Sequence, residues 1–211
     1  MIRVLIADDH PIVRKGLKEL VSGEPDMTVT AESGNGLEVL RLIETERFDV
    51  VLLDISMPGM SGLEILQKIR PEHPNLPILV LSGFPETELA MRTLKAGASG
   101  YLNKEMAPEE LVAAIRLVHS GRKYVSPAVA ELLANSVSRA SETPHDSLSD
   151  REYQVMLLLA AGKTVSEIAS EISLSVKTVS TYRARILEKM DLKNNAELML
   201  YAIRNNLAAR V

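Results

Sequence analysis

Residues 50–54 read Val-Val-Leu-Leu-Asp, a short continuous apolar run that ends at an aspartate. Such a run is typical of a parallel strand that is buried on both faces of a sheet. Val4–Ala7 and Ile78–Leu81 are runs of the same kind, and weaker ones lie at Met27–Ala31 and Gly100–Leu102. Amphipathic helical segments separate these runs, so we expect an α/β fold with a doubly wound, five-stranded parallel sheet.

Beyond residue 120 the pattern changes from alternating strands and helices to helices alone. A proline suited to a first helical turn predicts a helix at residues 127–137. Residues 138–147 then contain a proline and almost no large apolar side chain, which is typical of a linker. We therefore divide the chain into an α/β domain at residues 1–122, a linker at 123–147 that includes the helix, and a small all-α domain of four helices at 148–211.

The composition is that of a globular protein from a reducing compartment. Hydrophobic residues make up 46% of the chain and charged residues 25%, and there is no cysteine, so we expect neither disulfides nor cysteine-ligated zinc. No apolar run approaches the roughly 18 residues of a membrane span, and we expect a cytoplasmic protein without membrane contact. The net charge of −4 divides into −6 for residues 1–147 and +2 for residues 148–211. This mild basic excess does not by itself indicate nucleic-acid binding.

Three aspartates lie where predicted strands end. Asp8 and Asp9 follow the first strand, and Asp54 follows the third. In a doubly wound sheet, ligands bind beyond the carboxyl ends of the strands where the strand order reverses, so these carboxylates share one crevice if the two strands are neighbours. Such a cluster suits a hard divalent ion such as Mg²⁺. The alternative is that they are turn and helix-cap aspartates, which are common at strand ends.

Two further strand ends carry a hydroxyl and an ammonium group. Ser82 ends the fourth predicted strand, and Lys104 follows the fifth. Both side chains can point into the same crevice, where they would neutralise the oxygens of a phosphoryl group on a carboxylate. Each of them alone would be read as an ordinary surface residue. Together with the aspartates they indicate a phosphoryl-transfer site.

The segments ADDHPIV, LLDISMPGMSGLE, LVLS and GASGYLNKE resemble, in order and spacing, the flavodoxin-like receiver domain of two-component response regulators. The resemblance covers about residues 1–120. It implies that Asp54 is the phosphoacceptor and that a sensor histidine kinase is the partner. It also implies Mg²⁺ as the cofactor, held by Asp9, Asp54 and the backbone carbonyl of Ser56, with Asp8 acting largely through a metal-bound water.

The same resemblance implies how the phosphorylated state is sensed. Lys104 would contact the phosphoryl group, Ser82 would move to hydrogen-bond it, and Tyr101 would swing between exposed and buried positions. A loop at a strand end also places Phe84 beside the phosphoryl group. An apolar side chain there would exclude the water that hydrolyses the aspartyl phosphate. The alternative is that Phe84 is an outward-facing loop residue.

The C-terminal domain carries a short helix, a turn at Ser173–Ser175 and a longer helix that Ser175 is suited to cap. The longer helix is expected to bury Val179, Tyr182, Ile186 and Met190 and to present Lys177, Thr181, Ala184 and Glu188, flanked by Ser180 and Arg185. Short polar side chains that are flanked by lysine and arginine suit a helix that enters the major groove of DNA. The alternative is the solvated face of a small helical bundle.

The segments LSDRE, SEIA and SVKTV, with ILEKM downstream, resemble the LuxR-type helix-turn-helix of NarL/FixJ regulators over roughly residues 148–200. The resemblance implies double-stranded DNA as a partner and a homodimer when the protein is phosphorylated or DNA-bound. The residues that it assigns to DNA are Ser180, Thr181 and Ala184 at base-contact positions, Lys177 and Arg185 at phosphates, and Arg183 beside the buried face. The family often has lysine where this chain has Ser180, so base preference cannot be transferred from relatives.

The last predicted helix is apolar on more than one side. The stripe expected to be buried consists of Ala196, Met199, Leu200, Ile203 and Leu207. Leu198 and Ala202 lie off that stripe. They form either the edge of a wide core face or a dimer contact, which two half-sites on DNA would require.

Two other classes of protein share parts of this pattern. A haloacid-dehalogenase-like phosphatase also phosphorylates an aspartate at a strand end, but it normally carries a second aspartate two residues later, where this chain has Ser56. A LuxR-type regulator that senses a small molecule is disfavoured by two phenylalanines, no tryptophan and the carboxylate cluster. The sequence therefore predicts a DNA-binding response regulator and not an enzyme.

Overall fold

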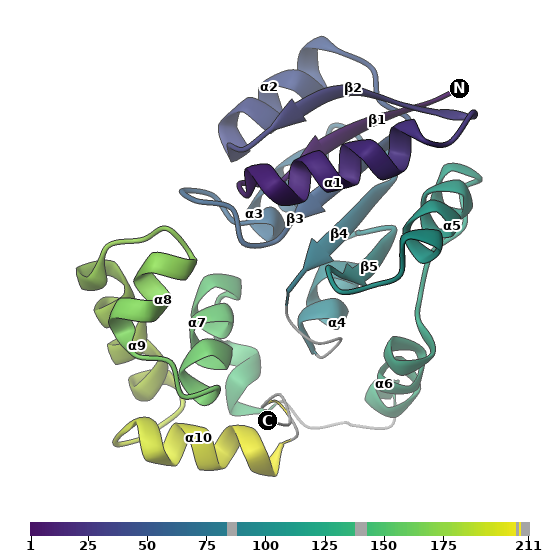
Figure 1. The fold of residues 1–211 in the computed structure, drawn as a ribbon. Helices are drawn as coiled ribbons and strands as arrows, with labels where there is room; N and C mark the ends of the chain where they lie inside the picture. The colour runs from purple at the N-terminus through teal and green to yellow at the C-terminus, as the bar shows by residue number, and fades with distance from the viewer. Residues whose placement is uncertain (84–87, 138–142, 206, 208–211) are drawn as a thin grey trace. The chain divides into compact units, whose positions relative to one another are not determined.

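The structure is a computed structural model that divides into two compact units, Met1–Leu133 and Ala134–Val211. The first unit contains a sheet with helices around it, and the described part of the second contains helices without a strand (Figure 1). The residues that the structure describes are 1–83, 88–137, 143–205 and 207.

Five parallel strands form the sheet of the first unit, in the order β2-β1-β3-β4-β5. Their bounds are β1 Ile2–Ala7, β2 Met27–Ser33, β3 Val50–Asp54, β4 Ile78–Ser82 and β5 Gly100–Asn103. Each predicted strand is present and slightly longer than the sequence indicates. Every residue of β3 and β4 is buried, because both faces of the sheet are covered by helices. The doubly wound α/β fold is therefore confirmed.

A helix follows each strand, and these helices form a layer on each face of the sheet (Figure 1). Their bounds are α1 Pro11–Ser22, α2 Gly36–Thr45, α3 Gly62–Ile69, α4 Glu88–Lys95 and α5 Pro108–His119. α1 and α5 lie on one face of the sheet and pack against each other. α2 and α3 form a second packed pair. Pro108 occupies the first turn of α5, where a missing N–H costs nothing. The core beneath α1 and α5 is aliphatic, and includes Val4, Ile6, Leu52, Leu79 and Ile115.

The strand order places the functional end of the sheet. Because β2 and β3 lie on opposite sides of β1, the point where the order reverses lies between β1 and β3. Ala7 pairs with Leu53 in the register of these two strands. Asp8 and Asp54 therefore come next on neighbouring strands, as the sequence predicts.

The rest of the chain is helical. The bounds of these helices are α6 Pro127–Val137, a 3₁₀ helix η1 Pro144–Ser147, α7 Asp150–Ala160, α8 Val165–Glu171, α9 Val176–Lys189 and α10 Asn195–Arg204. The bounds of α6 are those that the sequence predicts. The last residues of the predicted linker are folded, since His145 of η1 is buried and its Nδ1 lies 2.6 Å from the hydroxyl of Tyr201 on α10. In the described part of the chain, no helix has both the length and the apolar character needed to cross a membrane.

α8, a tight turn and α9 form a helix-turn-helix. Ser173 has φ of 52°, in the left-handed region, which reverses the chain between the two helices. The Ser175 side chain then caps α9 by accepting a hydrogen bond from the N–H of Thr178. Of the residues expected to be buried on α9, Val179, Ile186 and Met190 are buried, whereas Tyr182 is only half-buried.

The buried face of α10 differs from the predicted one. Leu198 and Ala202, which were expected off the main stripe, are completely buried, and Leu207 is also buried. Leu200 and Ile203 of the predicted stripe are 47% and 63% exposed. Ala196 is exposed and Met199 half-buried. The helix carries two apolar stripes, and its packing against α7 buries the one that the periodicity ranked second.

Candidate functional site

The ends of β1 and β3 bring two buried carboxylates together. Asp8 directly follows β1, Asp54 is the last residue of β3, and both are completely buried. Asp9, the next residue along the chain, is half-buried. Carboxylates are rarely buried unless a charge or a metal compensates them. Burial of this pair therefore points to a functional pocket more than to aspartates that merely shape turns.

Lys104 supplies a compensating charge. Its Nζ lies 2.7 Å from Asp8 Oδ2 and 2.9 Å from Asp54 Oδ2. The lysine reaches this position because β5 lies beside β4, and its backbone N–H donates a 2.7 Å hydrogen bond to the carbonyl of Ser82 at the end of β4. Residues from four separate parts of the sequence thus meet at one edge of the sheet.

The electrostatics of the pocket are dominated by burial. The pKa of Asp54 is raised from 3.8 to about 6, mainly because the carboxyl is buried; the positive charge of Lys104 lowers this pKa, and the negative charge of Asp8 raises it. Burial by itself would lower the pKa of Lys104, but the charges of Asp54 and Asp8 hold it above its ordinary value. Lys104 therefore remains an ammonium group, and Asp54 is mainly ionised at neutral pH.

The other predicted pocket residues lie at or near these strand ends. Ser82 is buried as the last residue of β4. Ser56 lies two residues after Asp54, and its backbone N–H donates a 3.1 Å hydrogen bond to Asp54 Oδ1. Tyr101 on β5 is 1% exposed, so in this structure it occupies the buried one of its two predicted positions. Phe84 lies outside the described residues.

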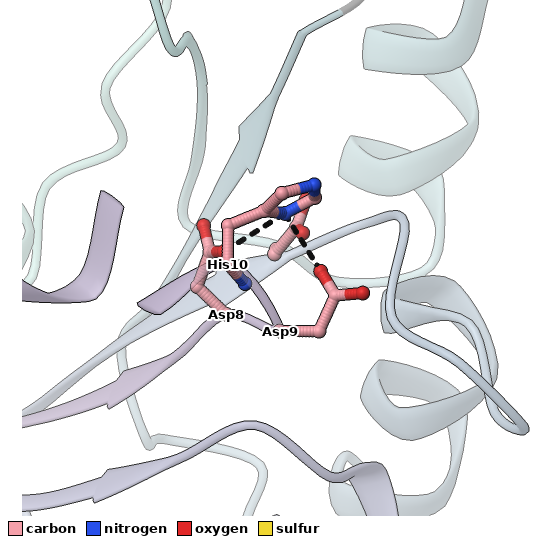
Figure 2. A group of neighbouring side chains, drawn as sticks. Asp8, Asp9 and His10 are labelled. Carbon is pink, nitrogen blue, oxygen red and sulfur yellow. Dashed lines mark hydrogen bonds and ion pairs between the residues drawn. The ribbon is translucent and has the colours of Figure 1, made fainter. Parts of the chain in front are cut away.

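Three further residues shape the pocket and carried no role in the sequence analysis. The His10 Nδ1 lies 2.8 Å from Asp9 Oδ1 (Figure 2), and Arg14 donates a 2.6 Å hydrogen bond to the Asp8 carbonyl. Gly62 begins α3 so close to β3 that a Cβ atom would lie 2.3 Å from the carbonyl oxygen of Asp54. His10 and Gly62 fall inside the quoted motifs, so their positions offered a signal. The reach of Arg14 depends on the fold.

The donor atoms of the pocket fit a divalent cation. One ligand atom from each of Asp8, Asp9, His10 and Asp54 can be chosen so that all lie within 4.8 Å of one another. Carboxylate oxygens are the ligands that Mg²⁺ takes from proteins, usually one or two of them with waters completing the octahedron. The oxygens at the mouth of this pocket meet that requirement.

α9 presents a polar face to solvent in the second unit. The residues exposed there are Lys177, Ser180, Thr181, Ala184 and Arg185. The Thr181 hydroxyl donates to the Lys177 carbonyl at 3.0 Å, which keeps its oxygen available as an acceptor. Arg183 is half-buried, and its Nε donates a 2.6 Å hydrogen bond to Asn195 Oδ1 on α10. Arg183 is thus held within the domain, beside the buried face where its helical angle placed it.

A carboxylate and lysine pocket at the switch point of this sheet, in one chain with a helix-turn-helix, defines a DNA-binding response regulator. Comparison with known families agrees in both parts of the chain. Residues 4–116 match the response regulator receiver domain, and residues 146–202 match the bacterial regulatory proteins of the luxR family. The chain therefore belongs to the NarL/FixJ family of response regulators and is a transcription regulator, not an enzyme.

Curated relatives match over nearly the whole chain. The response regulator UvrY of Escherichia coli K12 is 39% identical over 209 residues, which cover 98% of this chain and 96% of UvrY. The response regulator GacA of Pseudomonas aeruginosa is 38% identical over 209 residues, which cover 98% of each chain. The protein is thus a two-component response regulator of the UvrY and GacA type.

Solved structures of response regulators are similar in fold to this chain. RcsB of Salmonella enterica serovar Typhimurium, bound to a promoter in the presence of a phosphomimetic beryllofluoride, superimposes with a TM-score of 0.63 at 28% identity over 95% of this chain and 97% of RcsB. A LuxR-family response regulator from Aurantimonas superimposes with a TM-score of 0.62 at 34% identity, over 66% of this chain and 99% of that one. Another RcsB structure contains two dimers on two parallel DNAs.

Proposed function

We propose that Asp54 accepts a phosphoryl group from a sensor histidine kinase and that phosphorylation switches dimerisation and sequence-specific DNA binding. The observation that carries the proposal is the contact of one lysine, Lys104, with two buried carboxylates at the switch point of the sheet. A phosphoryl group on Asp54 would change the ion pairs that Lys104 makes with these carboxylates. The receiver fold implies a kinase partner of this class.

Asp54 acts as the nucleophile. A carboxylate oxygen attacks the phosphorus while the phosphorus–nitrogen bond to the kinase histidine breaks, and the leaving imidazole takes a proton from solvent. The Ser56 N–H, already bonded to Asp54 Oδ1, fixes the orientation of that carboxylate. Its pKa of about 6 means that the nucleophilic, ionised form predominates at neutral pH.

Mg²⁺ is the cofactor that these residues would hold, through Asp9, Asp54 and the carbonyl of Ser56, with Asp8 acting through water. The bound ion would neutralise charge on the transferring phosphoryl oxygens. Asp8 also positions Lys104 by ion pairing. Proximity of the acidic side chains supports this assignment.

Three residues convert the phosphoryl group into a change of conformation. Lys104 moves from its carboxylate partners onto a phosphoryl oxygen, since the phosphoryl group carries more negative charge than the carboxylate that it modifies. The Ser82 hydroxyl moves to donate a hydrogen bond to another phosphoryl oxygen. Tyr101, which is buried in this state, swings between exposed and buried positions.

The switch acts on a separate DNA-binding domain. We assign residues 1–122 to the receiver, 123–147 to the linker and 148–211 to the DNA-binding domain, in a cytoplasmic protein. On α9, Ser180, Thr181 and Ala184 would meet base edges, and Lys177 and Arg185 would meet phosphates. The exposure of these side chains supports this orientation. Arg183 would act mainly by holding α9 against α10, through Asn195.

The exposed apolar edge of α10 is the surface that we assign to the dimer on DNA. Leu200 and Ile203 are exposed there, whereas the opposite stripe is buried in the domain. Pairing two domains through this edge would convert weak half-site contacts into avidity. The assignment exchanges the roles of the two stripes relative to the sequence-based expectation.

The test follows phosphate and DNA affinity together. The full chain is incubated with Mg²⁺ and acetyl phosphate, and mass spectrometry, sedimentation and DNA titration are run on the same sample. We expect one added phosphate that persists without steady turnover of the donor, a shift toward dimers, and tighter DNA binding. Phosphorylation without any change in either dimerisation or DNA affinity would overturn the switch. Rapid multiple turnover of the donor would indicate a phosphatase.

A further inference from the structure

His10 turns its imidazole back toward the two aspartates that precede it (Figure 2). Its Nδ1 lies 2.8 Å from Asp9 Oδ1 and 3.3 Å from Asp8 Oδ1. The backbone N–H of His10 also donates a 2.8 Å hydrogen bond to Asp8 Oδ1, which fixes the residue at the mouth of the pocket. His10 occupies the N-cap position of α1, but its side chain makes no capping hydrogen bond. The imidazole is therefore directed at the pocket and is not used to cap the helix.

The spacing of these atoms fits adjacent ligands of one metal ion. Two ligands at right angles, each about 2.0–2.1 Å from an octahedral ion, lie roughly 2.8–3.0 Å apart. The 2.8 Å distance from His10 Nδ1 to Asp9 Oδ1 falls in this range, whereas the 3.3 Å distance to Asp8 Oδ1 lies above it. The imidazole also belongs to the group of side chains whose ligand atoms lie within 4.8 Å of one another, with Asp8, Asp9 and Asp54.

We propose that His10 can act as a direct nitrogen ligand of a divalent ion in this pocket, through Nδ1, and that it strengthens binding of first-row transition-metal ions while contributing little to binding of Mg²⁺. This inference rests on the proposed function, because the ion is the one that accompanies the phosphoacceptor Asp54. An imidazole strengthens binding of Ni²⁺, Zn²⁺ or Fe²⁺, whereas Mg²⁺ prefers oxygen and gives up its waters reluctantly. His10 side-chain exposure of 54% leaves room for the ring to approach the ion from the solvent side.

A simpler arrangement would have His10 donate a hydrogen bond from Nδ1 to Asp9 and never contact the ion. The two arrangements differ in the atom that the ring offers. A hydrogen bond needs a proton on Nδ1, whereas ligation needs the Nδ1 lone pair and the tautomer with its proton on Nε2. His10→Asn separates them, because an asparagine keeps an N–H donor near the position of Nδ1 but has no imidazole lone pair.

The direct test uses Mn²⁺ as the probe on the full chain without an affinity tag. Pulsed electron paramagnetic resonance of the Mn²⁺ complex should show coupling to a bound imidazole nitrogen. That coupling should be absent from both His10→Ala and His10→Asn. The matched control is His73→Ala, a histidine on the loop between α3 and β4 and outside the pocket, which should keep the coupling. A wild-type complex without nitrogen coupling, or with coupling that survives in His10→Ala, overturns the proposal.

Selectivity is measured by calorimetric titration with Ni²⁺ and with Mg²⁺ separately. We expect His10→Ala and His10→Asn to weaken Ni²⁺ binding by about tenfold or more while Mg²⁺ affinity changes by less than about threefold. Equal losses for both ions, or Ni²⁺ affinity retained in His10→Asn, would make His10 a hydrogen-bonding residue only. Asp9→Asn identifies the site, since it should weaken both ions. If the wild-type chain bound neither ion, or if Asp9→Asn had no effect, the proposed metal pocket itself would fail, which is a different outcome from loss of the His10 assignment alone.

Discussion

The receiver pocket and the exposed face of α9 are both built from polar side chains, but they are constrained in opposite ways. In the pocket, the Lys104 ammonium group lies 2.7 Å and 2.9 Å from the buried carboxylates of Asp8 and Asp54. On α9, Lys177, Thr181 and Arg185 are exposed to solvent. Charges in a buried cluster depend strongly on each other, whereas exposed charges act almost independently. A substitution in the pocket should therefore change several properties of the receiver together. A substitution on α9 should change a single property of DNA binding.

The largest effect is expected from removal of the phosphoacceptor. Asp54→Asn should abolish the added mass of one phosphate after incubation with acetyl phosphate and Mg²⁺, because no other side chain in the pocket combines its strand-end position with its hydrogen bond from Ser56. Asp9→Asn should still be phosphorylated, but only at higher Mg²⁺ concentration, since it loses a direct ligand. Intact-mass spectra across a Mg²⁺ series measure both. Equal labelling of Asp54→Asn and the wild type would refute the assignment.

The next effect distinguishes the two apolar stripes of α10. Leu198→Ala should lower the free energy of unfolding by about 2–5 kcal/mol, because it leaves a cavity at a completely buried position. Ile203→Ala is the matched control and should change stability by no more than about 0.5 kcal/mol, since that side chain is 63% exposed. Urea unfolding of the full chain, followed by circular dichroism, gives both values. A larger loss of stability in Ile203→Ala than in Leu198→Ala would show that the buried stripe of α10 is the one predicted from the sequence.

The third effect is a pH dependence of the metal-free protein. The pKa of Asp54 is about 6 in the folded chain against an ordinary value of 3.8, so the folded state binds more protons between these values. Stability contributed by protonated Asp54 is therefore lost as pH rises from about 4 to about 6, by no more than about 3 kcal/mol. Asp54→Asn should remove this loss and be the more stable protein at neutral pH. Melting curves in chelator at several pH values test it, and parallel curves for the two proteins would contradict it.

The smallest effects are expected on α9. Lys177→Ala and Arg185→Ala should each weaken binding to all DNA sequences alike and flatten the salt dependence by about one unit. Thr181→Ala should leave the salt dependence unchanged and alter base preference at one position of each half-site, by roughly 1–3 kcal/mol at most. DNA titrations at several salt concentrations separate the two behaviours. A salt slope unchanged in both basic variants would exclude this orientation of the helix.

Most of the pocket residues could be predicted from the sequence. Asp8, Asp54, Ser82 and Lys104 were predicted to converge because each follows or ends a short apolar run. The carboxyl ends of parallel strands meet at one edge, so their convergence needs only the strand order. The ion pairs of Lys104 with both carboxylates could not be predicted, because a long flexible side chain can reach several partners.

Helix faces were predicted less well. On α9, polar residues alternate clearly with apolar ones, and the predicted exposed face is exposed. On α10, both stripes are apolar, so the hydrophobic periodicity is satisfied whichever stripe is buried. Which stripe of α10 is buried depends on contacts with distant parts of the chain. Arg183 hydrogen-bonds Asn195 in the first turn of α10, and His145 lies against Tyr201.

The sequence by itself determined the α/β and all-α parts of this protein, the five strands, the pocket residues at their ends and the helix-turn-helix. These features follow from local patterns, which are set by backbone geometry and by the burial of one face. Only the tertiary structure decided the buried stripe of α10, the folding of η1 onto α10, and the approach of His10 to Asp9. Each of these is a choice between local arrangements of similar energy, and packing or electrostatics between distant segments makes that choice.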